Sequence, residues 1–212
     1  MFASTEEDRV AINLGGIANL SFLPRRGEVT GFDSGPGNCL LDLWATRHLG
    51  QPHDTGGSWA AGGRPIPGLL DRMLQEPYFA AAPPKSTGRD LFNETWLQTN
   101  LKGAEEAQQV QATLLELTAR SLADAIRRHC GGASRLIACG GGIRNHALMR
   151  RLAALCAPAV LETSDQRGID PQLVEATAFA WLAMRALEGQ TGNLPAVTGA
   201  RGARVLGAIY PA

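Results

Sequence analysis

Two glycine-rich segments near the start of the chain lie on either side of an aspartate. The first is Gly15-Gly16-Ile17-Ala18-Asn19, the second is Gly35-Pro36-Gly37-Asn38, and Asp33 closes a short apolar run between them. Consecutive glycines after a strand leave backbone N–H groups free to point at one spot, which favours anions such as phosphates. The Asp33 carboxylate could take a proton from a hydroxyl group or water, or hold a metal ion. An aspartate that caps its own turn explains the pattern equally well.

A third glycine segment, Gly140-Gly141-Gly142, follows a strand-like run and is followed by Asn145 and a helical pattern. It could bind a phosphate in the same way. A dinucleotide fingerprint would need glycine at position 145 and an acidic residue about 20 residues further on, for which Glu162 is the candidate. The first requirement fails, so a dinucleotide-binding oxidoreductase remains only an alternative.

Other polar residues could also contact a ligand. The run Pro84-Lys85-Ser86-Thr87-Gly88-Arg89-Asp90 combines two cations with two hydroxyl groups, a set that binds sugars and anions but is also common in solvated loops. Glu175 lies in an otherwise apolar helical pattern, where an unpaired charge is costly, so we expect it to have a polar partner or to line a cleft. Asp42 is expected to be a solvated or capping charge.

Composition narrows the classes of partner. The 212 residues include 44% hydrophobic ones, and 20 basic side chains balance 20 acidic ones without a long run of like charge. This argues against nucleic acid or anionic membranes as partners, and no stretch approaches the ~20 apolar residues of a membrane span. The four cysteines have no metal or disulfide spacing, so we expect free thiols in the cytoplasm. The histidines show no metal-ligand spacing either, and we assign no metal ligand.

Hydrophobic periodicity predicts an α/β chain. The expected strands are residues 9–14, 20–23, 28–32, 135–139 and 159–161, and the expected helices are residues 38–49, 67–74, 110–126, 148–155 and 171–187. Residues 50–103 have little periodicity and suggest an inserted subregion. The helix over residues 171–187 is apolar nearly all round, so we expect it to be buried. The order is β-β-β-α, an insertion, and then α-β-α-β-α.

Five motifs, in this order along the chain, resemble those of one protein family, anhydro-N-acetylmuramic acid kinase. They are Asn13-Leu14-Gly15-Gly16-Ile17-Ala18-Asn19, Gly31-Phe32-Asp33-Ser34-Gly35-Pro36-Gly37-Asn38, Pro84-Lys85-Ser86-Thr87-Gly88-Arg89, Cys139-Gly140-Gly141-Gly142 with Asn145, and Leu206-Gly207-Ala208. The similarity covers about residues 10–212. Five spaced matches are far more specific than any single glycine loop.

The resemblance implies an actin-like ATPase fold of the sugar kinase and Hsp70 superfamily, with ATP in a cleft between two α/β lobes. Residues 1–212 would form one C-terminal lobe, a mixed sheet flanked by helices, with the insertion at about residues 50–103. The family opens the 1,6-anhydro ring of anhydro-N-acetylmuramic acid with water and phosphorylates O6 from ATP with Mg²⁺, during peptidoglycan recycling. An amino sugar and ATP are the implied small-molecule partners, and we expect a homodimer.

The resemblance also implies roles for individual residues. Asp33 matches the catalytic base, and Glu175 matches a carboxylate near the sugar. The matches to nucleotide-binding positions are Gly15, Gly16 and Asn19 in a phosphate turn and Gly140, Gly141, Gly142 and Asn145 in the adenosine motif. Lys85, Ser86, Thr87 and Arg89 match a characteristic segment without individual roles.

One family feature does not occur in these residues. The family's first lobe carries a Gly-Thr-Ser-x-Asp-Gly phosphate loop, and no such motif is present here. We therefore expect most metal ligands to lie outside this chain and the 212 residues alone to have little or no kinase activity. A truncated, non-catalytic nucleotide-binding or dimerisation module is the alternative.

Overall fold

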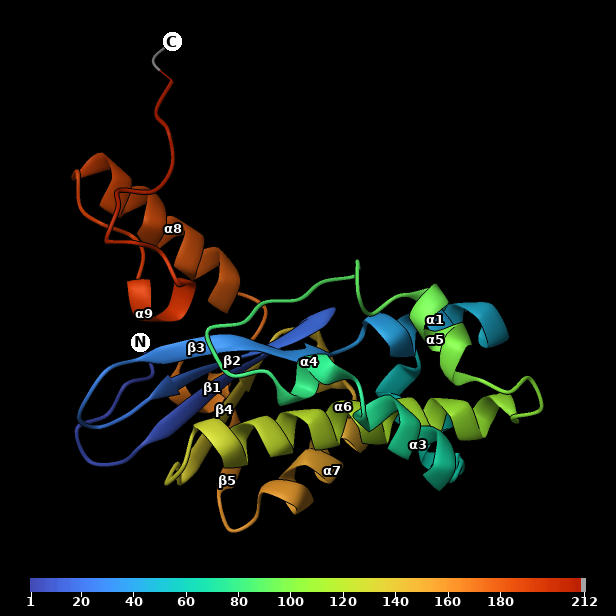
Figure 1. Ribbon diagram of the computed structural model, residues 1–212. Coiled ribbons are helices and arrows are strands. Elements are labelled where there is room, and N and C mark those ends of the chain that lie inside the picture. Colours follow the sequence, from blue (N-terminus) through green and yellow to red (C-terminus); the bar gives the residue numbers. More distant parts are fainter. Residues whose placement is uncertain (211–212) are drawn as a thin grey trace.

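A computed structural model describes residues 1–210 and shows a five-stranded mixed sheet (Figure 1). The strands are β1 (Arg9–Leu14), β2 (Ile17–Leu23), β3 (Thr30–Pro36), β4 (Arg135–Cys139) and β5 (Val160–Thr163), in the spatial order β3-β2-β1-β4-β5. β1, β2 and β3 form an antiparallel meander, whereas β4 pairs in parallel with both β1 and β5. The meander and the alternation that follows confirm the predicted element order and the predicted mixed sheet flanked by helices.

The strand directions bring the glycine segments together. β3 runs parallel to β1, because β2 pairs antiparallel with both, and β4 and β5 run the same way. The ends of β1, β3 and β4 therefore lie at one edge of the sheet. The first and third glycine segments follow the ends of β1 and β4, and the second includes the last residues of β3, so residues far apart in the sequence meet there.

Helices α6 (Ala107–His129) and α7 (His146–Cys156) cover one face of the sheet (Figure 1). Every second residue of β1, namely Val10, Ile12 and Leu14, is buried on this side in a cluster that includes Leu122 of α6 and Leu152 of α7. The buried face of the strand thus packs against the apolar faces of the two helices, which removes these side chains from water.

A second core lies between α1 (Cys39–Leu49), α6 and the irregular region that follows α1. That region contains only short helices: η1 (Thr55–Gly57), α2 (Ser58–Gly62), α3 (Pro67–Leu74), α4 (Pro77–Ala80) and α5 (Glu94–Asn100). Met73, Phe92 and Leu97 from these segments are buried together with Leu114 of α6. The subregion is therefore held by apolar packing although its sequence shows little periodicity.

The expectation of a buried last helix is wrong. α8 (Val174–Leu187) extends away from the opposite face of the sheet (Figure 1) and has no buried residue. Phe179 is 66% exposed and Leu187 is 75% exposed. No element among the described residues covers the outward side of α8, so its apolar composition does not lead to burial in this chain.

The C-terminal part also includes η2 (Gly141–Arg144), η3 (Ser164–Arg167) and α9 (Pro195–Thr198), and α9 contacts β3. None of the described helices is both long enough and apolar enough to cross a bilayer.

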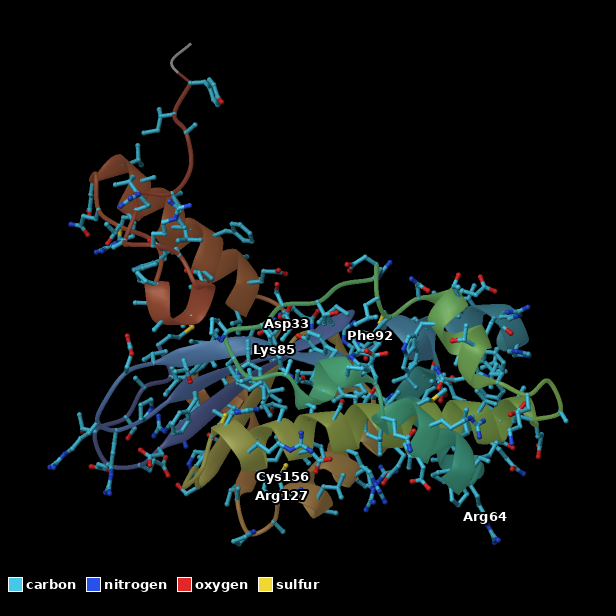
Figure 2. All side chains as sticks on the ribbon, viewed as in Figure 1. Asp33, Arg64, Lys85, Phe92, Arg127 and Cys156 are labelled. Atoms are coloured by element: carbon cyan, nitrogen blue, oxygen red, sulfur yellow. The ribbon has the colours of Figure 1, made fainter. Side chains whose placement is uncertain are left out.

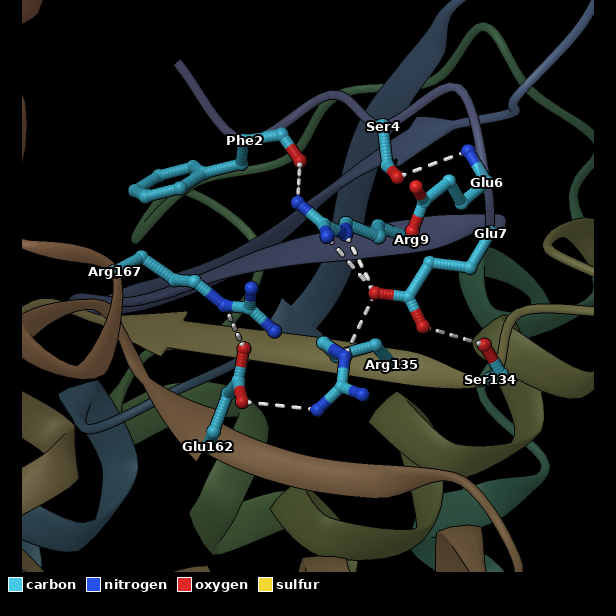
Figure 3. A network of polar contacts seen from close by, with 9 residues as sticks. All are labelled: Phe2, Ser4, Glu6, Glu7, Arg9, Ser134, Arg135, Glu162 and Arg167. Carbon is cyan, nitrogen blue, oxygen red and sulfur yellow. Dashed lines mark hydrogen bonds and ion pairs between the residues drawn. The ribbon is translucent and has the colours of Figure 1, made fainter.

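An ion-pair network ties β5 and η3 to the start of β4 (Figure 3). Glu162, only 7% exposed, accepts hydrogen bonds from Nε of Arg167 at 2.5 Å and from Nη1 of Arg135 at 3.1 Å. Arg135 also pairs with Glu7. Because two guanidinium groups already bind its carboxylate, Glu162 is not free to hold the ribose of a dinucleotide.

Candidate functional site

The first two glycine segments are hydrogen-bonded to each other at the sheet edge. The N–H groups of Gly37 and Cys39 both donate to the carbonyl of Gly16, at 2.9 and 3.0 Å, and the Asn38 N–H donates to the carbonyl of Gly15 at 2.9 Å. The N–H groups of residues 37–39 are therefore bound within the protein and are not available to a ligand. Because C=O and N–H point in opposite directions across a trans peptide, the Gly16 and Ile17 N–H groups face away from the second segment.

Gly37 allows this close approach. A β-carbon built at position 37 would lie 2.3 Å from the Gly15 carbonyl oxygen, so any side chain would force the two backbones apart. The side chain of Asn38 adds a further bond, from Nδ2 to the Leu14 carbonyl at 3.2 Å. The first two glycine segments thus form one rigid unit.

The third glycine segment packs against the end of β1. Gly140 has a φ of +83°, and a β-carbon there would lie 2.4 Å from Oδ1 of Asn13. Its N–H donates to the Pro171 carbonyl at 3.1 Å, which ties this segment to the chain leading into α8. Asn145 caps α7, because its Oδ1 accepts a hydrogen bond from the Leu148 N–H at 3.0 Å.

Most of the predicted site residues share one cavity of about 800 Å³. It lies between the open face of the sheet and the first turn of α8. The predicted residues that line it are Gly15, Gly16, Asn19, Gly140, Gly141 and Glu175. Glu175 therefore lines a cleft, which is one of the two environments expected for it.

The other two predicted nucleotide-binding residues line a neighbouring cavity of about 510 Å³. Gly142 and Asn145 are part of its wall, and Gly141 lines both cavities. The predicted nucleotide-binding set therefore divides into two adjoining spaces, one on each side of the third glycine segment.

Asp42 also lines this second cavity, which differs from the expectation of a solvated or capping charge. Asp42 is half-buried and α1 has no side-chain cap. Burial raises the pKa of the Asp42 carboxyl, while the charges of His53 and Arg89 oppose that shift.

Asp33 lies within β3 (Figure 2). It is not among the residues that line either of these cavities. Its Oδ2 accepts a hydrogen bond from the Thr87 N–H at 3.0 Å. Its backbone is held on both sides, because its N–H donates to the Lys85 carbonyl at 3.2 Å and its carbonyl accepts from the Tyr78 hydroxyl at 2.7 Å. The hydrogen bond of the carboxylate thus goes to a residue 54 positions away and not to its own turn.

Residues 84–90, here called the strap segment, supply most of these contacts. The Lys85 ammonium donates to the Tyr78 carbonyl at 3.0 Å and lies 4.6 Å from the centre of the Tyr78 ring. Desolvation, with the nearby charge of Arg128, lowers the pKa of Lys85. Lys85 is therefore an internal anchor of the strap segment and not a ligand-facing cation.

Tyr78 was not identified by the sequence analysis, although it contacts Asp33. Burial raises the pKa of its hydroxyl above the usual value, as does the charge of Asp33, so the hydroxyl stays protonated and remains a donor. No motif surrounds Tyr78 in the sequence. Only the tertiary structure identifies Tyr78, through its hydrogen bond to Asp33, which lies 45 positions away in the sequence.

The cysteines beside the glycine segments behave as buried apolar side chains. Cys39 and Cys139 are both buried, and desolvation raises the pKa of each thiol to about 11. Neutral thiols are weak nucleophiles. Within residues 1–210, no group of three or more His, Cys, Asp or Glu side chains is placed to hold a metal ion.

A mixed sheet with this strand order, with glycine turns gathered at the carboxyl ends of its parallel strands, defines an α/β lobe. A family model described as anhydro-N-acetylmuramic acid kinase matches residues 1–212. The chain therefore belongs to the anhydro-N-acetylmuramic acid kinase family, a family of carbohydrate kinases.

Curated relatives agree with this assignment. The anhydro-N-acetylmuramic acid kinase of Nitrosospira multiformis is 49% identical over 212 residues, which is 100% of this chain and 58% of that protein. The kinase of the same name from Xanthomonas axonopodis pv. citri is 52% identical over 213 residues, covering 100% of this chain and 57% of that protein. The chain thus spans somewhat more than half the length of these relatives.

Among solved structures, the activator of 2-hydroxyisocaproyl-CoA dehydratase from Clostridium difficile with bound ADPNP is similar with a TM-score of 0.49 and 18% identity. The match covers 79% of this chain and 56% of that one. A likeness this distant has no bearing on ligand or reaction.

Proposed function

We propose that this chain is the C-terminal lobe of a kinase that opens the 1,6-anhydro ring of anhydro-N-acetylmuramic acid and phosphorylates O6, giving N-acetylmuramic acid 6-phosphate in peptidoglycan recycling. The observation that carries the proposal is the fixed carboxylate of Asp33 on the strand that leads into the paired glycine segments. Membership of the kinase family supports the choice of substrate.

In this proposal, Asp33 is the general base. Its Oδ2 is held by the Thr87 N–H, which leaves Oδ1 to accept a proton from a water molecule. The water oxygen forms a bond to the anomeric carbon as the bond from that carbon to O6 breaks. O6 then attacks the terminal phosphorus, and ADP leaves. Glu175, on the wall of the larger cavity, would bind sugar hydroxyl groups.

The glycine segments fit a nucleotide. Gly15, Gly16 and Asn19 line the larger cavity without bulky side chains, which suits close approach by phosphate oxygens. Gly140, Gly141, Gly142 and Asn145 line the walls on both sides of the third segment, where they would contact the nucleoside. ATP supplies the phosphoryl group when bound.

The described residues do not provide a ligand set for Mg²⁺, because they contain no group of three or more His, Cys, Asp or Glu side chains placed to hold a metal ion. We therefore derive no step through the metal. The ligands expected for it would come from the rest of a longer protein, as would the first phosphate loop. On this basis the 212 residues alone should show little or no turnover.

A non-catalytic interaction module is the second candidate, because the exposed apolar side chains of α8, such as Phe179 and Leu187, are typical of a surface that is covered by a partner. A homodimer in the cytoplasm is the form that we propose for either candidate. A dinucleotide enzyme is disfavoured, because Glu162 is bound by Arg135 and Arg167.

The test uses a complete kinase in which these 212 residues replace the matching 58% of the Nitrosospira multiformis relative. Asp33→Asn keeps the size of the side chain and removes the base, so we expect turnover to fall by about 10²–10⁴-fold. Asp71→Asn, an exposed aspartate on α3, is the matched control and should retain full turnover. Near-normal turnover in Asp33→Asn would show that Asp33 is only a structural residue.

A further inference from the structure

The strap segment places one arginine directly over the first glycine segment. A β-carbon built on Gly16 would lie 3.4 Å from Nη2 of Arg89 and 3.7 Å from its Nε, so the guanidinium lies against the bare backbone of this turn. Arg89 is exposed, and its side chain makes no hydrogen bond or ion pair with any other residue in the range 1–210 that the structure describes. It differs in this from Lys85 in the same segment, whose ammonium is bound internally.

The charged side chains near this turn include several carboxylates, so binding of a phosphate there requires a nearby cation. Glu175 lines the cavity next to Gly16, and Asp33 and Asp42 lie on the neighbouring elements β3 and α1. Three carboxylates would repel a polyphosphate. The N–H groups of residues 37–39 are used by the first glycine segment, so they cannot compensate. Arg89 is the cation that this geometry brings to the turn.

We propose that Arg89 binds phosphoryl oxygens of the ligand at the Gly15–Gly16 turn. A guanidinium presents five N–H donors in a planar fork, which suits two oxygens of one phosphoryl group. The ligand class is a nucleoside polyphosphate. This inference rests on the proposed kinase function, and it assigns a binding role to a residue of the strap segment that had none.

The strap segment also explains how such a residue would be aligned with the base. Thr87, two residues before Arg89, donates its N–H to the Asp33 carboxylate, and Lys85 accepts from the Asp33 N–H. A single short segment therefore determines the positions of the proposed base and of the proposed phosphate-binding cation. Movement of one would move the other.

The experiment measures binding of ATP and of adenosine to the 212-residue chain by calorimetry. The variants are Arg89→Ala, Arg89→Lys and the matched control Arg64→Ala, an exposed arginine at the far end of the molecule (Figure 2). We expect Arg89→Ala to weaken ATP binding by about 10–100-fold, as for loss of a charge-assisted hydrogen-bonding group. Adenosine should bind equally to all four proteins, Arg89→Lys should be intermediate, and Arg64→Ala should match the wild type.

Each other outcome contradicts the inference in a recognisable way. Unchanged ATP affinity in Arg89→Ala would overturn the role of Arg89 while leaving the proposed kinase function intact. Equal losses of ATP and adenosine affinity would mean that Arg89 supports the fold or the nucleoside contacts instead of the phosphates. Absence of binding of either ligand to the wild type at millimolar concentration would overturn both this inference and the proposed nucleotide site. Circular dichroism melting of each variant separates these results from unfolding.

Discussion

The sheet edge at β3 and the helix α8 both carry residues proposed to act on the substrate, but the chain holds them very differently. Asp33 is bound through its N–H, its carbonyl and its carboxylate, by Lys85, Tyr78 and Thr87. Glu175 stands on a helix with no buried residue. Contacts within these 212 residues therefore fix the position of Asp33, whereas far fewer contacts fix the position of α8. Substitutions should affect the two regions unequally.

The largest effect is expected where backbone meets backbone. Gly37→Ala places a β-carbon 2.3 Å from the Gly15 carbonyl oxygen, and neither main chain can yield without breaking the hydrogen bonds between the two glycine segments. We expect a loss of about 3–5 kcal/mol in the free energy of unfolding, measured with urea. Gly131→Ala, where a β-carbon meets no atom within 4 Å, should change it by less than about 1 kcal/mol. A mild effect of Gly37→Ala would show that the edge is softer than described.

Paired phenylalanine substitutions compare the two regions directly. Phe92, labelled in Figure 2, is 1% exposed in the second core, whereas Phe179 on α8 is 66% exposed. Phe92→Ala should cost about 3–5 kcal/mol, whereas Phe179→Ala should cost less than about 0.5 kcal/mol in the same chain. Thermal or urea unfolding measures both. Comparable losses would mean that α8 is packed in solution.

A smaller effect is expected from the hydroxyl that holds the Asp33 carbonyl. Tyr78→Phe removes the 2.7 Å hydrogen bond and keeps the ring beneath Lys85, so stability should fall by about 1 kcal/mol. Faster hydrogen exchange at the Asp33 amide should accompany the loss. The control is Tyr210→Phe, because Tyr210 is 89% exposed. This substitution should change neither the stability nor the exchange rate at the Asp33 amide. Unaltered exchange in Tyr78→Phe would show that the strap segment alone fixes Asp33.

The smallest effect concerns pH. Hydrogen bonds from Arg151 and then Arg120 lower the pKa of Glu116, and a hydrogen bond from Arg135 lowers the pKa of Glu7 to about 2. A carboxylate whose pKa is lower in the folded state stabilises the fold above its unfolded pKa and loses this as pH falls. The urea concentration at the midpoint of unfolding should therefore decrease as the pH is lowered from about 4.5 to about 2. In Glu116→Gln this decrease should be smaller, because the contribution of the Glu116 carboxylate is absent. A midpoint independent of pH in this range would contradict these pairs.

Much of the fold could be predicted from the sequence, because its signals are local. The run over residues 9–14 alternates with period two, the glycines end it, and β1 has these bounds. The strand over residues 135–139 and the helix over residues 67–74 are likewise observed with the predicted bounds. The prediction that α8 is buried was wrong. Apolar composition shows which side chains a helix could bury, but not whether another element packs against them.

The site itself divides in the same way. The sequence by itself determined the glycine segments, Asp33 and the strap segment as candidates, since residue types and spacing are visible in it. Only the tertiary structure showed that Thr87 holds Asp33, that Tyr78 braces it, and that Arg89 lies on Gly16. These contacts join residues 45 to 73 positions apart, and sheet pairing together with helix packing, not local sequence preference, sets which of them meet.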